Sequence, residues 1–513
     1  MNLPIIKPFH SKYDSNLSLT TNYGADLAVI FIDESDLDNK KIISPTLKAL
    51  DDTFGGTLSA LISMGDFEGK WLQTSVTLAA QQNNAKRVLL VGSGKKCDFA
   101  PARARQLGIK AAEMSLALKA QNVVLACNSK LIGGAEQLAQ TRIGFSMGLY
   151  KYPNSNMSQE DKVKCETPIN ATFIHAASAN SEQNKKAEIL NNSMNICRLL
   201  QDGPPNIVTP KYVAENILEE AKKCGLNVQV FGAQKLREMG FGAMMAVAGG
   251  SAQEAQLVVV EYKPEKFTKT LAFVGKGLTM DTGGYSIKTP STNQEGMKYD
   301  MSGAAVSLSS ILAIAKLKLP IHVYAVGALC ENMIDAHSYR VGDILTSYSG
   351  KTIEIIDTDA EGRIVLSDAL HYAAKDLKAD YIVEYSTLTG AMIIALGHVA
   401  AGVFAFNSTL EKAVLKASET TGERTHSLPV WEEVADEMKG TISDLVNIGS
   451  TRRAAGSMAA AAFLKEFVND VPFAHIDIAG VADNNKSIGY TQKGGSGYGI
   501  QLSVEIAQEL AST

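Results

Sequence analysis

The sequence has few of the residues that form disulfides, cysteine-based redox sites and histidine-rich metal centres. Of its 513 residues, six are cysteine and eight are histidine. No Cys-x-x-Cys pair occurs, so the scattered cysteines predict reduced, mostly buried thiols of a cytoplasmic protein. Neither His-x-His nor His-Glu-x-x-His occurs, so any metal site must use oxygen ligands, with or without a lysine.

The sequence also has no excess of basic charge, and its first residues do not form a signal-type apolar core. The net charge of -5 argues against general electrostatic binding of nucleic acid. The segment from Met1 to Phe9 has no apolar signal core, and we expect a cytoplasmic protein. One apolar stretch, residues 388–406, has nearly the length of a membrane helix, but glycines and His398 interrupt it. We predict a buried core segment there and no membrane contact.

The length and patterning of the chain predict two α/β domains. A chain of 513 residues exceeds a single hydrophobic core, and strand and helix patterns alternate in both halves. A polar run at 178–186 separates the halves, so we predict domains over 1–185 and 186–513. The expected strands are 27–32, 87–94, 271–275, 322–327, 353–356 and 381–385, and the expected helices are 187–201, 302–317 and 363–377.

Two acidic clusters follow expected strands of the second domain. Asp357-Thr-Asp-Ala-Glu-Gly-Arg363 comes after a β-branched run, and in an extended backbone its Asp359 and Glu361 would leave the same face. The strand 270–274 opens into Gly275-Lys-Gly-Leu-Thr-Met-Asp281-Thr-Gly-Gly284, with Lys288 and Asp300 further on. We expect both clusters where a strand ends and a loop begins, at the carboxyl edge of the sheet, where ligands bind.

The four carboxylates of Asp281, Asp300, Asp359 and Glu361 would concentrate negative charge at this edge. Two such acids repel by about 4 kcal/mol at an effective dielectric near 20, so a cation must lie between them. Two divalent ions would neutralise all four, as in two-metal hydrolytic sites. Each acid alone could equally be a loop residue or a helix cap, and Asp300 could be an N-cap. The conjunction of the two clusters favours a metal site.

At these residues the sequence resembles the leucine aminopeptidases, also called cytosol aminopeptidases. The family pattern Asn-Thr-Asp-Ala-Glu-Gly-Arg-Leu corresponds to Asp357–Ile364, and Val-Gly-Lys-Gly-x-Thr-Phe-Asp-[Ser/Thr]-Gly-Gly corresponds to Val274–Gly284. Further matching segments are Gly203–Pro210, Glu331–Met333, Thr387–Gly390 and His475–Gly480. The resemblance covers about residues 195–505. It implies a smaller, macro-like N-terminal α/β domain and a C-terminal catalytic α/β domain with a central mixed sheet flanked by helices.

Position by position, the resemblance implies two divalent ions, Zn or Mn, with Mg and Co as alternatives. Asp281 and Glu361 would bridge the ions, Asp359 would complete one site, and Lys276 and Asp300 would complete the other. A lysine ligand must be neutral. Losing its proton at pH 7 costs about 4.6 kcal/mol from a reference pKa near 10.4, which an adjacent dication can supply.

The resemblance gives two further cations catalytic roles. Lys288 would hydrogen-bond the substrate carbonyl or the developing oxyanion, and Arg363 would hold a bicarbonate ion that acts as general base. A metal bound to the free α-amine of the substrate would restrict cleavage to the first peptide bond. The residues implied in substrate binding are Met297, Thr387, Leu388 and Gly390.

The expected function is therefore a dinuclear metallo-aminopeptidase for peptides with leucine-like N-terminal residues, and the family implies a homohexamer. Two alternatives stay open. One is a DNA-binding architectural protein on an aminopeptidase fold, which the net charge of -5 disfavours. The other is a narrow dipeptidase, for a substrate such as Cys-Gly.

Three features depart from the family pattern. The segment from Lys288 to Asp300 is one residue longer than usual. Ser302 stands where the family has glycine, which adds a Cβ at a tight helix entry. Asp357 replaces the usual asparagine and adds a carboxylate, which either hydrogen-bonds structurally or raises neighbouring pKa values.

Overall fold

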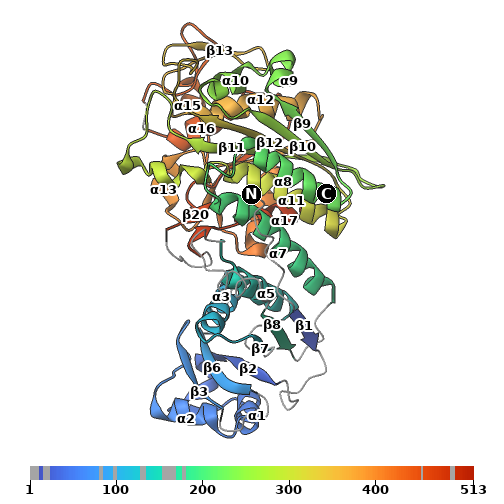
Figure 1. Cartoon of the computed structure of the whole chain (residues 1–513), viewed down its shortest axis with the longest axis vertical. Helices are drawn as coiled ribbons and strands as arrows, with labels where there is room; N and C mark the ends of the chain where they lie inside the picture. The colour runs from blue at the N-terminus through green and yellow to red at the C-terminus, as the bar shows by residue number, and fades with distance from the viewer. Residues whose placement is uncertain are drawn as a thin grey trace. The chain divides into compact units, whose positions relative to one another are not determined.

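The computed structural model describes residues 11–14, 24–79, 85–95, 101–127, 134–152, 169–175, 181–451, 454–485 and 492–512. The chain divides into two compact units, Met1–Asn192 and Ser193–Thr513 (Figure 1). This division falls inside the helix α7 (Ser181–Asp202), which begins six residues before the helix predicted at 187–201. The domain boundary predicted at 185/186 lies in the same helix and stays a prediction.

The first unit contains a six-stranded sheet in the order β1-β8-β7-β2-β6-β5. All neighbours are parallel except β5, which is antiparallel to β6. The strands are β1 (Ser11–Asp14), β2 (Ala25–Asp33), β5 (Thr74–Leu78), β6 (Ala85–Gly94), β7 (Asn122–Cys127) and β8 (Asn170–His175). A small hairpin, β3 (Leu37–Asp38) and β4 (Lys41–Ile42), follows β2.

Both faces of this sheet are buried, which explains the continuous apolar strands at 27–32 and 87–94. In β2, Leu27, Val29 and Phe31 join one apolar cluster, while Ala28 and Ile30 join another. The first cluster packs against α3 (Pro101–Ala117) and α5 (Ala135–Leu149), and the second against α1 (Pro45–Thr53) and α2 (Thr57–Met64). The two strands predicted in this unit are confirmed.

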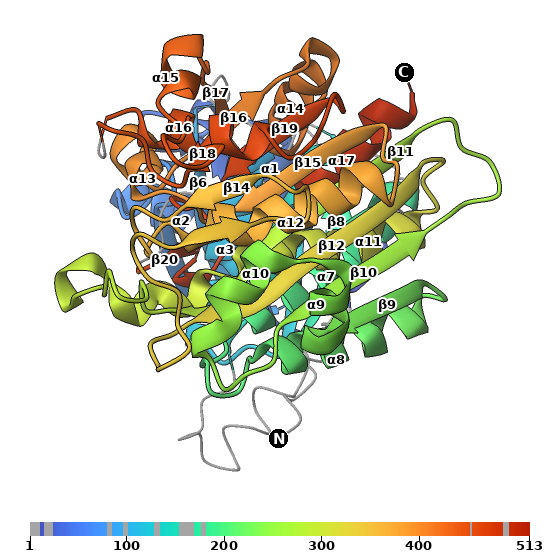
Figure 2. The same ribbon diagram turned by 90° about the horizontal axis from the view of Figure 1, so that it is seen from above.

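The second unit is built on an eight-stranded sheet in the order β17-β16-β19-β15-β11-β12-β10-β9 (Figure 2). The four central strands are parallel, whereas β10 and β16 run antiparallel to their central neighbours, so the sheet is mixed as predicted. The strands are β9 (Asn227–Gly232), β10 (Gln256–Tyr262), β11 (Thr270–Asp281), β12 (His322–Asn332), β15 (Tyr381–Ser386), β16 (Ala401–Ala405), β17 (Thr425–Ser427) and β19 (Phe473–Asp477).

Helices cover both faces of this sheet (Figure 1). On one face, α12 (Glu361–Lys375) packs with α10 (Gly242–Val247) and α16 (Gly456–Lys465), and α15 (Glu432–Asp436) packs against α16. On the other, α11 (Ser302–Leu317) contacts β11, β12 and β15 and packs against α8 (Pro210–Lys223) and α17 (Ile500–Ala511). The remaining helices are α9 (Ala233–Met239), α13 (Gly390–Leu396) and α14 (Ser408–Thr421).

Two strand predictions need correction. β11 does not end at residue 275 but runs to Asp281, because its pairing with β12 continues through a bulge between Leu278 and Met280. The segment predicted as strand 353–356 is β14 (Thr352–Glu354), which is not part of the catalytic sheet. It belongs to a separate three-stranded sheet with β13 (Ile344–Thr346) and β18 (Leu445–Val446). A two-stranded pair, β20 (Asp483–Asn484) and β21 (Gly494–Gly495), completes the unit.

The apolar segment predicted to be buried at 388–406 is buried only in part. Met392 and the strand β16 are buried, but Ile394 on α13 is 89% exposed, so the prediction is wrong for that helix. A different stretch, Gln294–Leu317, is long and apolar enough to cross a membrane, but 83% of its apolar window is buried inside the protein. Its burial against the central sheet is typical of a core helix.

Candidate metal centre

The two acidic clusters meet at the carboxyl ends of the central parallel strands. β11 ends at Asp281, β12 ends at Asn332, and the loop that begins with Thr387 follows β15. Glu361 is the first residue of α12, where the helix N-terminus favours negative charge. The predicted edge of the sheet is therefore where these side chains lie.

Three buried carboxylates form the centre of this cluster. Ligand oxygens of Asp281, Asp300 and Glu361 lie within 4.8 Å of one another, and the three residues are 2%, 5% and 1% exposed. Lys276 projects from β11 between them, with its Nζ 2.8 Å from Asp300 Oδ1 and 2.8 Å from Glu361 Oε1. Lys276 therefore bridges two acids that come from different elements.

Lys288 pairs with the other two acids. Its Nζ lies 3.0 Å from Asp281 Oδ2 and 2.5 Å from Asp359 Oδ1. The Asp359 side chain is 35% exposed, so it forms the open side of the cluster. We predicted that Asp359 and Glu361 leave the same face of an extended backbone, and this is wrong. Asp359 lies in a turn and Glu361 opens a helix, so the two acids contact different lysines.

The burial of the acids shifts their protonation. Desolvation, together with the charge of Asp281, raises the pKa of Glu361 to about 8 and that of Asp300 to about 6. Burial also opposes the charge of Lys276, but the surrounding carboxylates outweigh this effect and hold its pKa above the ordinary value. A cation at this site therefore stabilises the ionised form of the clustered carboxylates.

The donor set fits a divalent metal ion. Asp300 Oδ2 and Glu361 Oε2 are buried and have no hydrogen-bond partner among the described residues. A buried carboxylate oxygen without a donor is costly, and a metal ion would coordinate it. Carboxylate oxygens together with one amine suit Mg, Mn and Zn.

Neighbouring polar groups fix the ligands. Asp281 Oδ1 accepts hydrogen bonds from the Gly283 amide at 2.8 Å and from Asn332 Nδ2 at 2.9 Å. The Thr387 hydroxyl donates to Asp300 Oδ1 at 2.8 Å, while the Thr387 carbonyl accepts from Lys276 Nζ at 3.3 Å. Such contacts orient metal ligands and tune their affinity.

Arg363 is buried below the same turn. Its Nη1 donates to the Asn447 carbonyl at 2.9 Å, and its Nε has no partner among the described residues. Burial lowers the pKa of Arg363 to about 10. Asn447 also holds the acidic turn, because its Oδ1 accepts from the Ile356 amide at 2.7 Å and its Nδ2 donates to the Asp357 carbonyl at 2.6 Å.

Comparisons with known proteins identify the family of the chain. Residues 195–504 match the cytosol aminopeptidase family, catalytic domain, and residues 29–158 match the N-terminal domain of the same family. The chain belongs to the cytosol aminopeptidase family. It is therefore an aminopeptidase of a metal-dependent family, with the two-domain α/β fold that the sequence predicted.

Individual relatives cover nearly the whole chain. A probable cytosol aminopeptidase of Rickettsia africae is 34% identical over 501 residues, which is 96% of this chain and 98% of the relative. A probable cytosol aminopeptidase of Roseiflexus castenholzii is 37% identical over 458 residues, 88% of this chain and 93% of the relative. Among solved structures, a substituted tomato leucine aminopeptidase superposes with a TM-score of 0.88 at 30% identity, covering 99% of this chain and 98% of that one.

A second solved structure contains metal. It is the bottromycin maturation enzyme BotP in complex with Mn, with a TM-score of 0.81 at 28% identity, covering 95% of this aminopeptidase and all of BotP.

The residues predicted to bind substrate surround the cluster unevenly. Thr387 contacts it directly, Leu388 packs partly buried against the central core, and Gly390 is exposed at the start of α13. Met297 lies half-buried in the 3-10 helix Gln294–Tyr299 that leads to Asp300.

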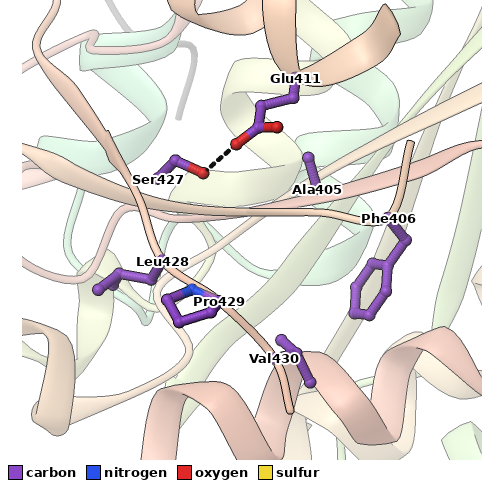
Figure 3. Close-up of a pocket in the computed structure, with 7 residues that line it drawn as sticks. All are labelled: Ala405, Phe406, Glu411, Ser427, Leu428, Pro429 and Val430. Atoms are coloured by element: carbon purple, nitrogen blue, oxygen red, sulfur yellow. Dashed lines mark hydrogen bonds between the residues drawn. The ribbon is translucent and has the colours of Figure 1, made fainter. Parts of the chain in front are cut away.

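A cavity of about 300 Å³ lies between β16 and residues 427–430, and none of the predicted substrate-binding residues lines it (Figure 3). The Ser427 hydroxyl donates to Glu411 there.

The departures from the family pattern have local explanations. Asp300 does not cap α11, whose N-cap is Met301 without a side-chain hydrogen bond, so the simpler cap interpretation is wrong. The Ser302 hydroxyl donates to the Tyr299 carbonyl at 2.6 Å, which accommodates the additional side chain. Asp357 Oδ1 accepts from the Asp359 amide at 2.9 Å, which confirms the structural hydrogen bond, and the charge of Asp357 also contributes to the raised pKa of Asp359.

Sequence reasoning missed three polar residues that hold the site together. Asn332 fixes Asp281, Asn447 fixes Arg363 and the acidic turn, and Asp477 binds the loop after β15. Asn332 and Asp477 each end an apolar strand, and both lie in segments that match the family pattern. A polar residue at the end of a buried strand was the signal available for these two.

Proposed function

We propose that this aminopeptidase is a dinuclear enzyme that removes leucine-like N-terminal residues from peptides. The observation that carries the proposal is the buried cluster of Asp281, Asp300 and Glu361 around Lys276, with Lys288 and Asp359 beside it. Its four carboxylates match the charge of two divalent ions. The ions would be Zn or Mn, or alternatively Mg or Co.

Each residue then has a role. Asp281 and Glu361 would bridge the two ions, Lys276 and Asp300 would complete one site, and Asp359 would complete the other. When bound, the ions supply Lewis acidity and lower the pKa of water from 15.7 toward 7. Lys276 must lose its proton to bind metal, which the nearby dications favour.

The two remaining cations would act on the substrate. Lys288 reaches the open side of the cluster, where its side chain is 12% exposed, and would donate to the oxyanion that develops on the scissile carbonyl. Arg363 would hold a bicarbonate ion as general base. The buried Nε, which has no partner among the described residues, supports this role.

The leucine preference rests on the residues after β15. Leu388 is partly buried and apolar, and a Cβ at Gly390 would meet nothing within 4 Å, so the start of α13 leaves open space. The resemblance further implies a cytoplasmic homohexamer. Exposed apolar side chains such as Ile394 and Ile442, 89% and 68% exposed, support an assembly that covers them.

Hydrolysis of leucine p-nitroanilide tests the proposal. We expect activity that disappears with a chelator, returns with Mn or Zn and is absent in Glu361→Gln. N-acetyl-leucine p-nitroanilide should resist cleavage, because the free α-amine is needed for binding. Asp368→Asn is the matched control. Asp368 is a fully buried carboxylate on the same helix, but it accepts from the Met244 and Tyr348 amides away from the cluster.

The outcomes separate clearly. Asp368→Asn should lose stability and keep activity and metal. Metal-loaded protein that leaves leucyl amides intact, or a Glu361→Gln variant as active as wild type, would refute the dinuclear leucyl aminopeptidase. Equal cleavage of the acetylated substrate would refute recognition of the α-amine.

A further inference from the structure

The loop after β15 is held from two sides. β15 and β19 are parallel neighbours, and Ser386, the last residue of β15, pairs with Asp477, the last residue of β19. The Ile478 amide donates to the Ser386 carbonyl at 2.8 Å, so the two strand ends are joined. Residues 387–389 start directly from this junction.

On one side, the loop is bound by the Asp477 carboxylate, which is completely buried. Asp477 Oδ1 accepts from the Leu388 amide at 3.3 Å and from the Ala479 amide at 3.1 Å. Asp477 Oδ2 accepts from the Thr389 hydroxyl at 2.7 Å. The Thr389 oxygen also lies 2.6 Å from Ser457 Oγ and caps α13 by accepting from the Met392 amide in its first turn.

On the other side, the loop touches the metal centre. The Thr387 hydroxyl donates to Asp300 Oδ1 at 2.8 Å, and the Thr387 carbonyl accepts from Lys276 Nζ at 3.3 Å. Adjacent residues of the loop thus contact a buried carboxylate and two proposed metal ligands. Because the three residues are consecutive, we expect a shift of Leu388 or Thr389 to move Thr387.

We propose that Asp477 is a positioning residue, which fixes loop 387–389 and thereby sets both the metal-ligand geometry and the substrate side-chain contact of Leu388. The effect on catalysis rests on the proposed function, whereas the effect on metal binding does not. Burial alone would favour a neutral residue at this position, since an ionised carboxylate in the core is costly unless it is bound. The hydrogen bonds from the loop supply that compensation.

The buried charge has a second neighbour on the same side of the sheet. Asp477 is one of the carboxylates that oppose the lowering of the Arg363 pKa by burial. His475, two residues earlier on β19, and Glu384 on β15 are both completely buried, with 2.5 Å between Nδ1 and Oε2. Asp477 therefore lies beside a buried pair of polar side chains.

Matched variants test the proposal. Thr389→Val removes the hydroxyl that binds Asp477 with little change in shape, and Thr389→Ser keeps it. Asp477→Asn removes the charge. The control is Thr421→Val, because Thr421 is also buried and its hydroxyl also bonds the backbone, donating to the Ala417 carbonyl and accepting from the Glu423 amide, at the end of α14.

We expect Thr389→Val and Asp477→Asn to lower kcat/KM for leucine p-nitroanilide by about tenfold or more, the range for losing a buried hydrogen bond to a charged group. The ratio of kcat/KM for leucine p-nitroanilide to that for alanine p-nitroanilide should fall. The Kd for Mn²⁺, measured by calorimetry, should rise several-fold. Thr389→Ser should recover these values. Thr421→Val should lower the melting temperature by a similar amount but leave kcat/KM, the substrate ratio and the Mn²⁺ Kd unchanged.

The opposite result is equally clear. If Thr389→Val and Asp477→Asn lose only stability, as Thr421→Val does, Asp477 is a structural cap and the proposal is overturned. If the wild-type protein cleaves no aminoacyl p-nitroanilide, the proposed function fails, and the Mn²⁺ affinities of the same variants still decide the role of Asp477.

Discussion

Lys276 should stabilise the metal-free protein through its charge. Its Nζ lies 2.8 Å from oxygens of Asp300 and Glu361, and the three side chains are at most 6% exposed. Removing one partner of such a buried pair typically costs about 3–5 kcal/mol, because a charge stays buried without compensation. Lys276→Met keeps an unbranched apolar side chain and removes the charge. We expect its free energy of unfolding at pH 8, in chelator, to be lower by about 3 kcal/mol or more.

This loss should shrink as the pH falls. Burial raises the pKa of Glu361 to about 8 and of Asp300 to about 6, above their ordinary values near 4. A carboxylate with a raised pKa binds more protons in the folded than in the unfolded protein, so its contribution to stability grows as the pH drops through the folded pKa. Without Lys276 both carboxylates can still be neutralised by protons. The difference between wild type and Lys276→Met should therefore be smaller at pH 5.5 than at pH 8.

Urea unfolding of metal-free protein, followed by circular dichroism at both pH values, measures the effect. The matched control is Lys223→Met on α8. Lys223 also contacts two acids, at 2.9 Å from Glu219 and 2.8 Å from Glu220, but on the protein surface. A surface pair of this kind contributes less than about 1 kcal/mol. A loss for Lys276→Met no larger than for Lys223→Met, or one equal at pH 5.5 and 8, would refute the reasoning.

Three further predictions concern the bound metal. Mn²⁺ affinity should increase with pH and binding should release protons, since Lys276 and Glu361 both lose protons to become ligands. Calorimetry in buffers of different ionisation enthalpy measures the number of protons released. Binding without proton release would contradict the prediction. Chelation should lower the melting temperature, because metal at 100 times its Kd stabilises by about 2.7 kcal/mol, and Asp281→Asn should lose this response. Asn332→Leu should weaken Mn²⁺ binding about 10–100-fold, because Asp281 Oδ1 loses its 2.9 Å donor. An unchanged Kd would mean that the Gly283 amide alone orients Asp281.

The location of the site could be predicted because its ligands lie in two short segments. Lys276 and Asp281 follow one apolar strand, and Asp359 and Glu361 follow another β-branched run. Helices 302–317 and 363–377 were also predictable from their apolar patterns and correspond to α11 and α12, with α12 beginning two residues earlier. Local composition was sufficient for these elements.

The pairing of strands was not predictable in the same way. The glycines after Val274 indicated a loop, yet β11 continues through them. A Cβ at Gly275 would lie 2.3 Å from the Gly303 carbonyl oxygen of α11, so the glycine there permits helix and strand to approach closely. The strand predicted at 353–356 corresponds to β14, which pairs with β13 and β18 and not with the catalytic sheet. A short apolar strand does not encode its partner.

The distribution of charge depends on the same tertiary contacts. Sequence predicted four carboxylates and two lysines in one place, with two divalent ions to balance the four negative charges. It could not show that each lysine takes two acids, Lys276 with Asp300 and Glu361, and Lys288 with Asp281 and Asp359. This division makes the two lysines unequal, because Lys276 is 4% exposed and Lys288 is 12% exposed.

The inequality follows the roles proposed for them. Lys276 is enclosed by Asp300 and Glu361, and its side chain is only 4% exposed. A metal ion could therefore replace its proton while the amine stays in the same position. Lys288 contacts Asp359, which is 35% exposed, so it lies on the side of the cluster that is open to a substrate. A ligand must be fixed, whereas a group that follows a developing oxyanion must be able to adjust. Burial therefore distinguishes two chemically identical side chains, in agreement with the proposal that one is a ligand and the other a catalytic cation.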